Sequence, residues 1–272
     1  AVTLIQKDST DQKNACPKEM KAIEDRIIKN YGIYAINLCE LDLDFAEEIE
    51  KVIDKIYNEY PEARGYITNL TLVNTTMQED YIAAFMPYMN FASSNTTDGY
   101  PNVIKTQVLL NTRYFLNETR LESSVKSSSA QGWFPKNATK SSPVAHEFGH
   151  YLSFIAMMNS HGLDSILLED ASNEDTIMDI LVDFSNNTFS LTMIEEAYNN
   201  YKKDHPDYQG TLDEFRGSIS QYALAKDNNG EYIYDETIAE AFHDCYLNGE
   251  NAVDASKYIE EVLKKYVSKV GE

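Results

Sequence analysis

The spacing of apolar residues along this 272-residue chain changes near Ser142, and this change limits the folds that the chain can adopt. Before Ser142, segments with apolar residues at helical spacing alternate with short runs rich in Ile, Val, Tyr, Phe and Thr, which are typical of strands. After Ser142, helical spacing dominates. The pattern predicts an α+β fold in which helices pack on a small mixed sheet and a mainly helical half follows.

Glycine and proline mark the ends of several expected elements. A first helix is expected at 20–31, where Gly32 can end it, and a second at 44–60, where Pro61 stops it. Strands are expected at 33–39, 65–74, 80–88 and 103–114. Later helices are expected at 143–159, 173–184, 191–203, 233–247 and 252–268, with a hairpin-like turn at 227–230.

The chain shows no internal repeat and no low-complexity linker. Residues 1–16 are polar and are expected to form a loose N-terminal tail. We expect residues 17–270 to form a single domain built as two lobes with a cleft between them. The N-terminal lobe, 17–141, is expected to be α+β, and the C-terminal lobe, 142–270, is expected to be mainly helical.

The charge of the chain excludes some partners. The net charge is −21, whereas nucleic acids and anionic membranes bind basic surfaces, so we expect neither as the main partner. No run of about 18 apolar residues occurs, so no transmembrane helix is expected. The chain begins Ala1-Val2-Thr3 without an initiator Met, which fits removal of a signal peptide and fits an arbitrary boundary equally well.

Two of the three cysteines are expected to form a disulfide. Cys16 precedes the first expected helix, and Cys39 ends the strand that follows it. A helix of about 15 residues and a returning strand of about seven each span roughly 22–23 Å, so their outer ends should meet. We therefore predict a Cys16–Cys39 disulfide in an oxidising, extracellular setting, with Cys245 as a free buried thiol. The cysteines show no Cys-x-x-Cys spacing, so a thiolate zinc site is not expected.

The segment that carries the chemistry begins the helical half. Ser142 can cap a helix there, and Pro143 suits its first position. One turn in, His146 and His150 stand four residues apart, so both side chains can reach one zinc ion at roughly 2.0–2.1 Å. Glu147, next to the first histidine, is placed to act as a general base on zinc-bound water. The alternative is a pair of surface histidines on an ordinary helix.

A catalytic zinc usually has a third protein ligand, and two glutamates compete for this role. Glu169 has suitable spacing from the motif, but Asn173 stands one turn later where an acid would be wanted. Glu236 and Glu240 share one face of a later helix among apolar residues, where unpaired charges would be costly. We expect Glu236 to bind the metal and Glu240 to accept the free ring N–H of a motif histidine. The alternative is an amphipathic helix with a solvated acidic edge.

Several short segments, taken together and in order, resemble one family. They are His-Glu-Phe-Gly-His at 146–150, Ser-Gln-Tyr-Ala at 220–223 and Glu-Thr-Ile-Ala-Glu-Ala-Phe at 236–242, preceded by 107–115 and by Gly-Trp-Phe-Pro at 132–135. The chain from 17 to 265 resembles the catalytic domain of anthrax lethal factor and related secreted gluzincin peptidases of Gram-positive bacteria. The resemblance implies a zincin-like two-lobe fold, one bound Zn²⁺ and peptidase activity.

The resemblance also implies roles for individual residues. It implies that Glu236 is the third zinc ligand and that Tyr222 donates a hydrogen bond to the tetrahedral intermediate. Residues 225–233 are longer than the usual link between this tyrosine and the glutamate helix, so Tyr232 and Tyr234 are alternatives for the donor.

The resemblance implies a way of binding substrate as well. An extended peptide would pair with an edge strand, as in other proteins that bind peptides by adding a strand to a sheet. The strand residues expected to take part are Val108, Leu109, Leu110 and Asn111. Trp133 and Phe134 are expected as walls of a pocket, with packing anchors as the alternative role.

These observations favour a secreted, monomeric zinc-dependent endopeptidase of a gluzincin type that acts on a protein or peptide substrate. Two alternatives stay open. One is a zinc-binding, toxin-derived module with little or no turnover, although the presence of Glu147 argues against it. The other is a zinc hydrolase that cleaves acyl bonds other than peptide bonds.

Overall fold

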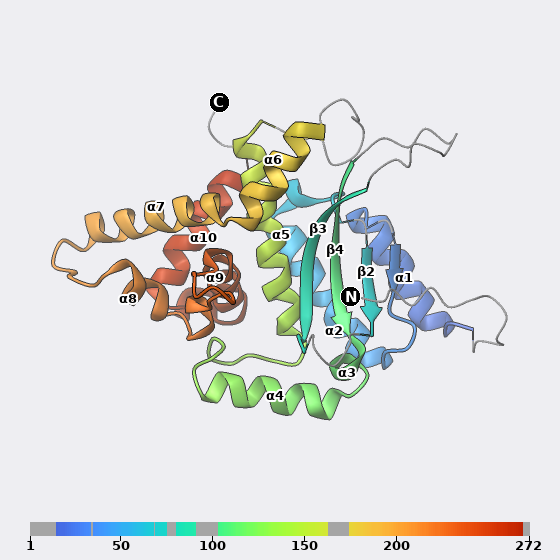
Figure 1. Ribbon diagram of the computed structural model, residues 1–272. Coiled ribbons are helices and arrows are strands. Elements are labelled where there is room, and N and C mark those ends of the chain that lie inside the picture. The colour runs from blue at the N-terminus through green and yellow to red at the C-terminus, as the bar shows by residue number, and fades with distance from the viewer. Residues whose placement is uncertain are drawn as a thin grey trace.

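The computed structural model describes residues 15–33, 35–67, 69–74, 80–90, 103–162 and 174–268. The expected tail at 1–16 lies almost wholly outside these ranges. The described part is an α+β fold, as expected, with a small mixed sheet beside many helices (Figure 1). None of the helices in these ranges is long and apolar enough to span a membrane.

The elements before the motif helix form a sheet with helices around it. The strands are β1 (Ala35–Asn37), β2 (Asn69–Val73), β3 (Ala83–Asn90) and β4 (Val103–Asn111). The helices are α1 (Lys18–Tyr31), α2 (Leu43–Glu59), α3 (Thr112–Phe115) and α4 (Glu118–Ala130), with a 3-10 turn η1 (Pro61–Ala63). Gly32 ends α1 in the left-handed conformation, as its position predicts.

The elements after residue 141 are helical, as expected. They are α5 (Ser142–Ser160), α6 (Glu174–Ser185), α7 (Thr188–Asp204), α8 (Leu212–Gly217), α9 (Tyr234–Asn248) and α10 (Asp254–Val267), with 3-10 turns η3 (Tyr222–Leu224) and η4 (Gly249–Asn251). The turn expected at 227–230 is present, because Lys226 and Tyr232 form an isolated antiparallel bridge. In Figure 1, α7–α10 lie on one side of α5 and the sheet lies on the other.

Helix α4 is not apparent from apolar spacing. Its Ser-rich sequence offers only Leu121 and Val125 as buried apolar residues, one turn apart. The helix begins because the side chain of Asn117 accepts a hydrogen bond from the backbone N–H of Arg120 at 3.1 Å. Capping rather than a long apolar stripe therefore marks this element.

The strand order corrects one expectation about the sheet. The order is β1-β2-β4-β3, with β4 parallel to β2 on one side and antiparallel to β3 on the other. The segment Val108, Leu109, Leu110 and Asn111 was expected at an edge, but it lies inside the sheet, and all four residues are fully buried. A continuous apolar run is what a strand covered on both faces requires. The edge next to α5 is β3.

Aromatic side chains hold β3 against α5. The ring of Phe85 on β3 lies 6.0 Å from the rings of both Tyr151 and Phe154 on α5. On another face of α5, the ring of Phe148 packs edge-on against Tyr57 of α2 at 5.8 Å. Helix α5 is buried almost all round, as expected for a helix in the centre of a core.

The predicted disulfide between Cys16 and Cys39 is present, with the two Cα atoms 5.1 Å apart. It joins Cys16, two residues before α1, to the turn after β1. Cys245 is a free, buried cysteine on α9, also as predicted. The helix and the short strand that follows it therefore bring the two cysteines together, as their lengths predict.

We predict that thiol titration of the denatured, unreduced protein detects one free thiol, that of Cys245. Reduction should lower the free energy of unfolding by about 3 kcal/mol, because the opened loop gains conformational freedom in the unfolded chain. Denaturant unfolding with and without reductant measures this, and a Cys245→Ser variant is the control. Three titratable thiols would contradict the pairing.

Candidate metal centre

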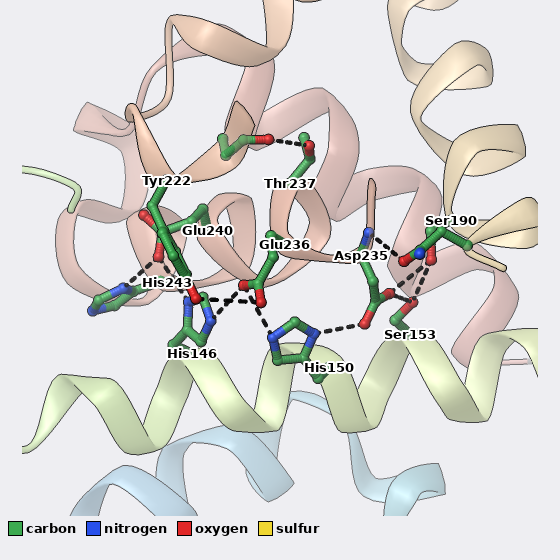
Figure 2. A network of polar contacts seen from close by, with 12 residues as sticks. His146, His150, Ser153, Ser190, Tyr222, Asp235, Glu236, Thr237, Glu240 and His243 are labelled. Carbon is green, nitrogen blue, oxygen red and sulfur yellow. Dashed lines mark hydrogen bonds and ion pairs between the residues drawn. The ribbon is translucent and has the colours of Figure 1, made fainter. Parts of the chain in front are cut away.

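Helices α5 and α9 cross where Gly149 of the motif faces Ala239. A Cβ atom at position 149 would lie only 2.8 Å from the Cα of Ala239, so the backbones approach as closely as glycine allows. This approach lets side chains of α9 reach the motif histidines on α5. Figure 2 shows the two helices with their polar side chains between them.

The two motif histidines and Glu236 converge. The Nε2 atoms of His146 and His150 lie 3.0 Å and 3.2 Å from the same carboxylate oxygen of Glu236. One ligand atom from each of the three residues lies within 4.8 Å of the others, which is compatible with a single bound ion. The expected trio is therefore brought together by the fold.

The other nitrogen of each imidazole is held by a second carboxylate. Nδ1 of His146 lies 2.7 Å from Oε1 of Glu240, and Nδ1 of His150 lies 2.6 Å from Oδ2 of Asp235. Each carboxylate can accept the Nδ1–H, so a neutral ring would keep its lone pair on Nε2, which faces the centre of the site. This is the tautomer that a metal ion requires from a histidine ligand.

The carboxylates at the centre favour positive charge on the two histidines between them. Burial disfavours a charge on His146, but hydrogen bonds to Glu236 and Glu240 outweigh burial and raise its pKa to about 10. Burial also disfavours a charge on His150, but the charges of Glu236 and Asp235 raise its pKa. Despite its burial, the charge of His150 and the hydrogen bonds from both histidines hold the pKa of Glu236 below its usual value. Two imidazoles and one carboxylate form a ligand set typical of catalytic zinc, which keeps a further position open.

Asp235 is a site residue that the spacing of the motifs did not indicate. Its Oδ1 accepts hydrogen bonds from the hydroxyls of Ser153 and Ser190, at 2.5 Å and 2.7 Å, while its Oδ2 holds His150. Glu240 was expected to serve either histidine, and it serves His146. The sequence did contain a signal for Asp235, because it is the acid directly before Glu236. Both residues lie at the start of α9, from which both side chains can reach α5.

Glu147 is buried beside the candidate metal ligands, with 7% of its surface exposed. Burial raises its pKa above the usual value, although the two histidines partly oppose this effect. Its carboxylate also accepts a hydrogen bond from the backbone of Phe85 on β3. The Glu147 carboxylate is therefore placed between the candidate metal ligands and strand β3.

A cavity of about 340 Å³ opens over these residues. Strand β3 contributes Ala83, Ala84 and Phe85 to its wall. Its remaining lining residues are Tyr81, His146, Glu147, His150, Phe184, Ser185, Asn187, Tyr222, Ile233, Asp235 and Glu236. The cavity therefore extends from the β3 edge of the described sheet to the candidate metal centre.

Tyr222 lies at this centre. Its hydroxyl donates to Oε1 of Glu236 at 3.4 Å, and its ring lies 5.7 Å from the ring of His146. Burial, followed by the charges of Glu236 and Glu147, raises the pKa of the hydroxyl, so the proton needed for hydrogen-bond donation stays on it.

The two alternative tyrosines lie elsewhere. The rings of Tyr232 and Tyr234 lie 4.5 Å and 4.4 Å from the guanidinium of the fully buried Arg216. The same guanidinium donates to the backbone oxygen of Ala223 at 3.2 Å and to the hydroxyl of Thr237 at 3.0 Å. The longer link at 225–233 therefore packs around Arg216, which also ties the residue after Tyr222 to α9.

The residues expected at the walls of the site differ in their positions. Trp133 was expected as a pocket wall, but 47% of its surface is exposed and it lines neither cavity at the described site. Its backbone oxygen instead accepts from the backbone N–H of Tyr222 at 3.2 Å. Phe134 does line a second cavity of about 200 Å³ beside Glu147. Asn111 supports the site from inside the sheet, because its amide donates to the backbone oxygen of Tyr81 at 2.7 Å.

We predict that Glu236→Ala abolishes tight zinc binding, because it removes one of three ligands. Glu240→Ala and Asp235→Asn should weaken zinc binding by about 10–100-fold, because they release one histidine each. Metal content after dialysis measures all variants. Glu169, the rival ligand, lies outside the described residues, and Glu169→Ala should keep its zinc. The opposite result for Glu169 and Glu236 would overturn the ligand assignment.

Comparison with known proteins provides no family for the chain. No family model matches it, and neither do any curated proteins or solved structures. The interpretation of the centre therefore depends on the residues and contacts described above, and the resemblance to the lethal factor domain stays a prediction from short motifs.

Proposed function

We propose that this protein is a zinc-dependent endopeptidase. The observation that carries the proposal is the convergence of two histidine Nε2 atoms on Glu236, with a buried Glu147 beside them and a cavity that opens along a free strand edge. A binding site alone has no need of a buried carboxylate that coordinates nothing. The residues that would hold Zn²⁺ are His146, His150 and Glu236.

Zinc bound at this site would polarise the scissile carbonyl and lower the pKa of water. Glu147 accepts the proton of the attacking water and passes it to the leaving amine. Its raised pKa suits this task, because the carboxyl must both take and release a proton. The Tyr222 hydroxyl donates a hydrogen bond to the oxygen that gains negative charge as the carbonyl is attacked.

The substrate would lie along β3 rather than along β4. Strand β3 is last in the sheet order, so its second edge has no partner strand within the described ranges. This edge contributes to the cavity wall, and its Phe85 backbone reaches Glu147. An extended peptide paired with β3 would place a backbone carbonyl near the metal-binding atoms.

The proposal also includes a two-lobe fold, a similarity to known peptidases and secretion of the protein. A zincin-like arrangement of two lobes, 17–141 and 142–270, is supported by a cavity whose walls come from β3 on one side and from α5 and α9 on the other. The similarity to gluzincin peptidases such as the lethal factor catalytic domain is supported by the ligand set. The Cys16–Cys39 disulfide supports secretion, because disulfides persist in oxidising compartments.

We predict that the protein cleaves members of a diverse peptide mixture, that a chelator stops cleavage and that added Zn²⁺ restores it. Glu147→Gln should keep zinc and fold but lose about 10²–10⁴-fold in turnover, because an amide cannot accept the proton. Glu122→Gln, which changes an exposed acid on α4, is the matched control. Metal binding without any cleavage would instead favour a binding module, and full activity in Glu147→Gln would remove this residue from the mechanism.

We predict that Tyr222→Phe lowers turnover by about 10²–10³-fold with little effect on KM, because it removes one donor to the developing oxyanion. Tyr232→Phe should have no such effect, since its ring packs on Arg216. Steady-state kinetics on one cleaved peptide compares the two variants. Equal activity of Tyr222→Phe and the unmodified protein would show that this hydroxyl is not the donor.

A further inference from the structure

A third histidine, His243, lies at one end of the polar network and has no role in the proposed reaction. It stands on α9 one turn after Glu240, and only 1% of its surface is exposed. Its ring packs 5.9 Å from the ring of His146 and 6.0 Å from that of Phe134. Figure 2 shows it close to Glu240 and His146. A buried imidazole needs partners for both nitrogens, and both are identifiable.

The first partner is Ser142, in the first turn of α5. The Ser142 hydroxyl donates its single proton to the backbone oxygen of Thr139 at 2.9 Å and accepts from the backbone N–H of Thr139 at 3.0 Å. Nε2 of His243 lies 2.8 Å from the same hydroxyl oxygen. The hydroxyl can accept from Nε2–H or, by turning from Thr139, donate to Nε2, so this contact forms whichever ring nitrogen of His243 carries the proton.

The second partner is Glu240. Nδ1 of His243 lies 3.4 Å from Oε1 of Glu240, the oxygen that also contacts Nδ1 of His146 at 2.7 Å. The other oxygen of Glu240 accepts from the Ser220 hydroxyl at 2.7 Å. The fully buried Glu240 carboxylate thus meets three side chains: His146, farther along α5, Ser220, and His243, which joins it to Ser142 in the first turn of α5.

We propose that His243 is a positioning residue for the metal centre. It spans from Ser142 at the start of α5 to Glu240 on α9, and so fixes the carboxylate that orients the ring of His146. The inference rests on the proposed zinc site. His243 acts through Glu240 and is not one of the three zinc ligands. Residues that orient metal ligands typically change affinity by about 10–100-fold, and a residue one step further out should act near the lower end.

The test compares zinc affinity in folded variants by competition with a chromophoric chelator. His243→Phe keeps a planar ring but removes both nitrogens, and should weaken zinc binding by about 10-fold. Ser142→Ala removes the anchor while leaving the imidazole, and should weaken binding in the same direction. His243→Gln can still form a hydrogen bond with Ser142 and should retain more affinity than His243→Phe. His161→Phe is the matched control, because His161 pairs with Asp183 in an exposed contact away from the centre.

Two further readouts separate this role from simple packing. Cobalt substituted for zinc should show altered visible absorption in His243→Phe, because the ligand field follows the orientation of His146. Circular dichroism of each metal-free variant checks the fold, and zinc binding by Ser142→Ala is the deciding result if His243→Phe does not fold.

The outcomes separate the inference from the proposed function. If the unmodified protein binds zinc, and if Ser142→Ala and every folded His243 variant bind zinc with the same affinity, the inference about His243 is wrong while the proposed function stands. If the unmodified protein binds no zinc, the proposed function fails as well. Two zinc ions per chain would also overturn the inference, since His146, Glu240 and His243 could together hold a second ion.

Discussion

The close contact of α5 with α9 is the constraint on which the rest of the site depends. Gly149 allows it, because any side chain at that position would meet the backbone of Ala239. With the helices this close, acids on the first turns of α9 reach histidines one turn apart on α5. A wider separation would leave the same side chains solvated and unpaired, and the polar network would not form. The motif glycine is therefore as important for the geometry as the motif histidines.

Burial of so many acidic groups has an electrostatic consequence. Glu147, Asp235 and Glu240 are nearly inaccessible to solvent, and Glu236 is only slightly exposed. Unpaired buried carboxylates are costly, so the network stabilises the fold only when cations lie among them. The histidines provide this charge when protonated, and a divalent ion would provide it while leaving both rings neutral. The same groups thus contribute to stability and prepare the centre for metal.

Local distances explain why some features of this protein follow from its sequence. The Cys16–Cys39 pair is separated by one helix and one short strand, so the path length alone brings the sulfur atoms together. The two motif histidines share a helix face because four residues make about one turn. Glu236 and Glu240 were recognisable because acids at that spacing among apolar residues require partners. The strand order is different, because which strands lie side by side depends on contacts between distant segments. For this reason the segment 108–111 was expected at an edge but lies inside the sheet.

The sequence by itself determined the α+β class, the motif helix, the disulfide and the identity of the two glutamates. Each of these depends on periodicity or short chain paths, which physical chemistry constrains locally. The tertiary structure decided that β3 is the edge strand beside the site, that Asp235 holds His150, and that Tyr222 lies at the centre while Tyr232 and Tyr234 pack on Arg216. It also brought His243 between Ser142 and Glu240. These contacts join segments up to 101 residues apart, and only the packing of whole helices and strands selects among the many pairings that the residue types allow.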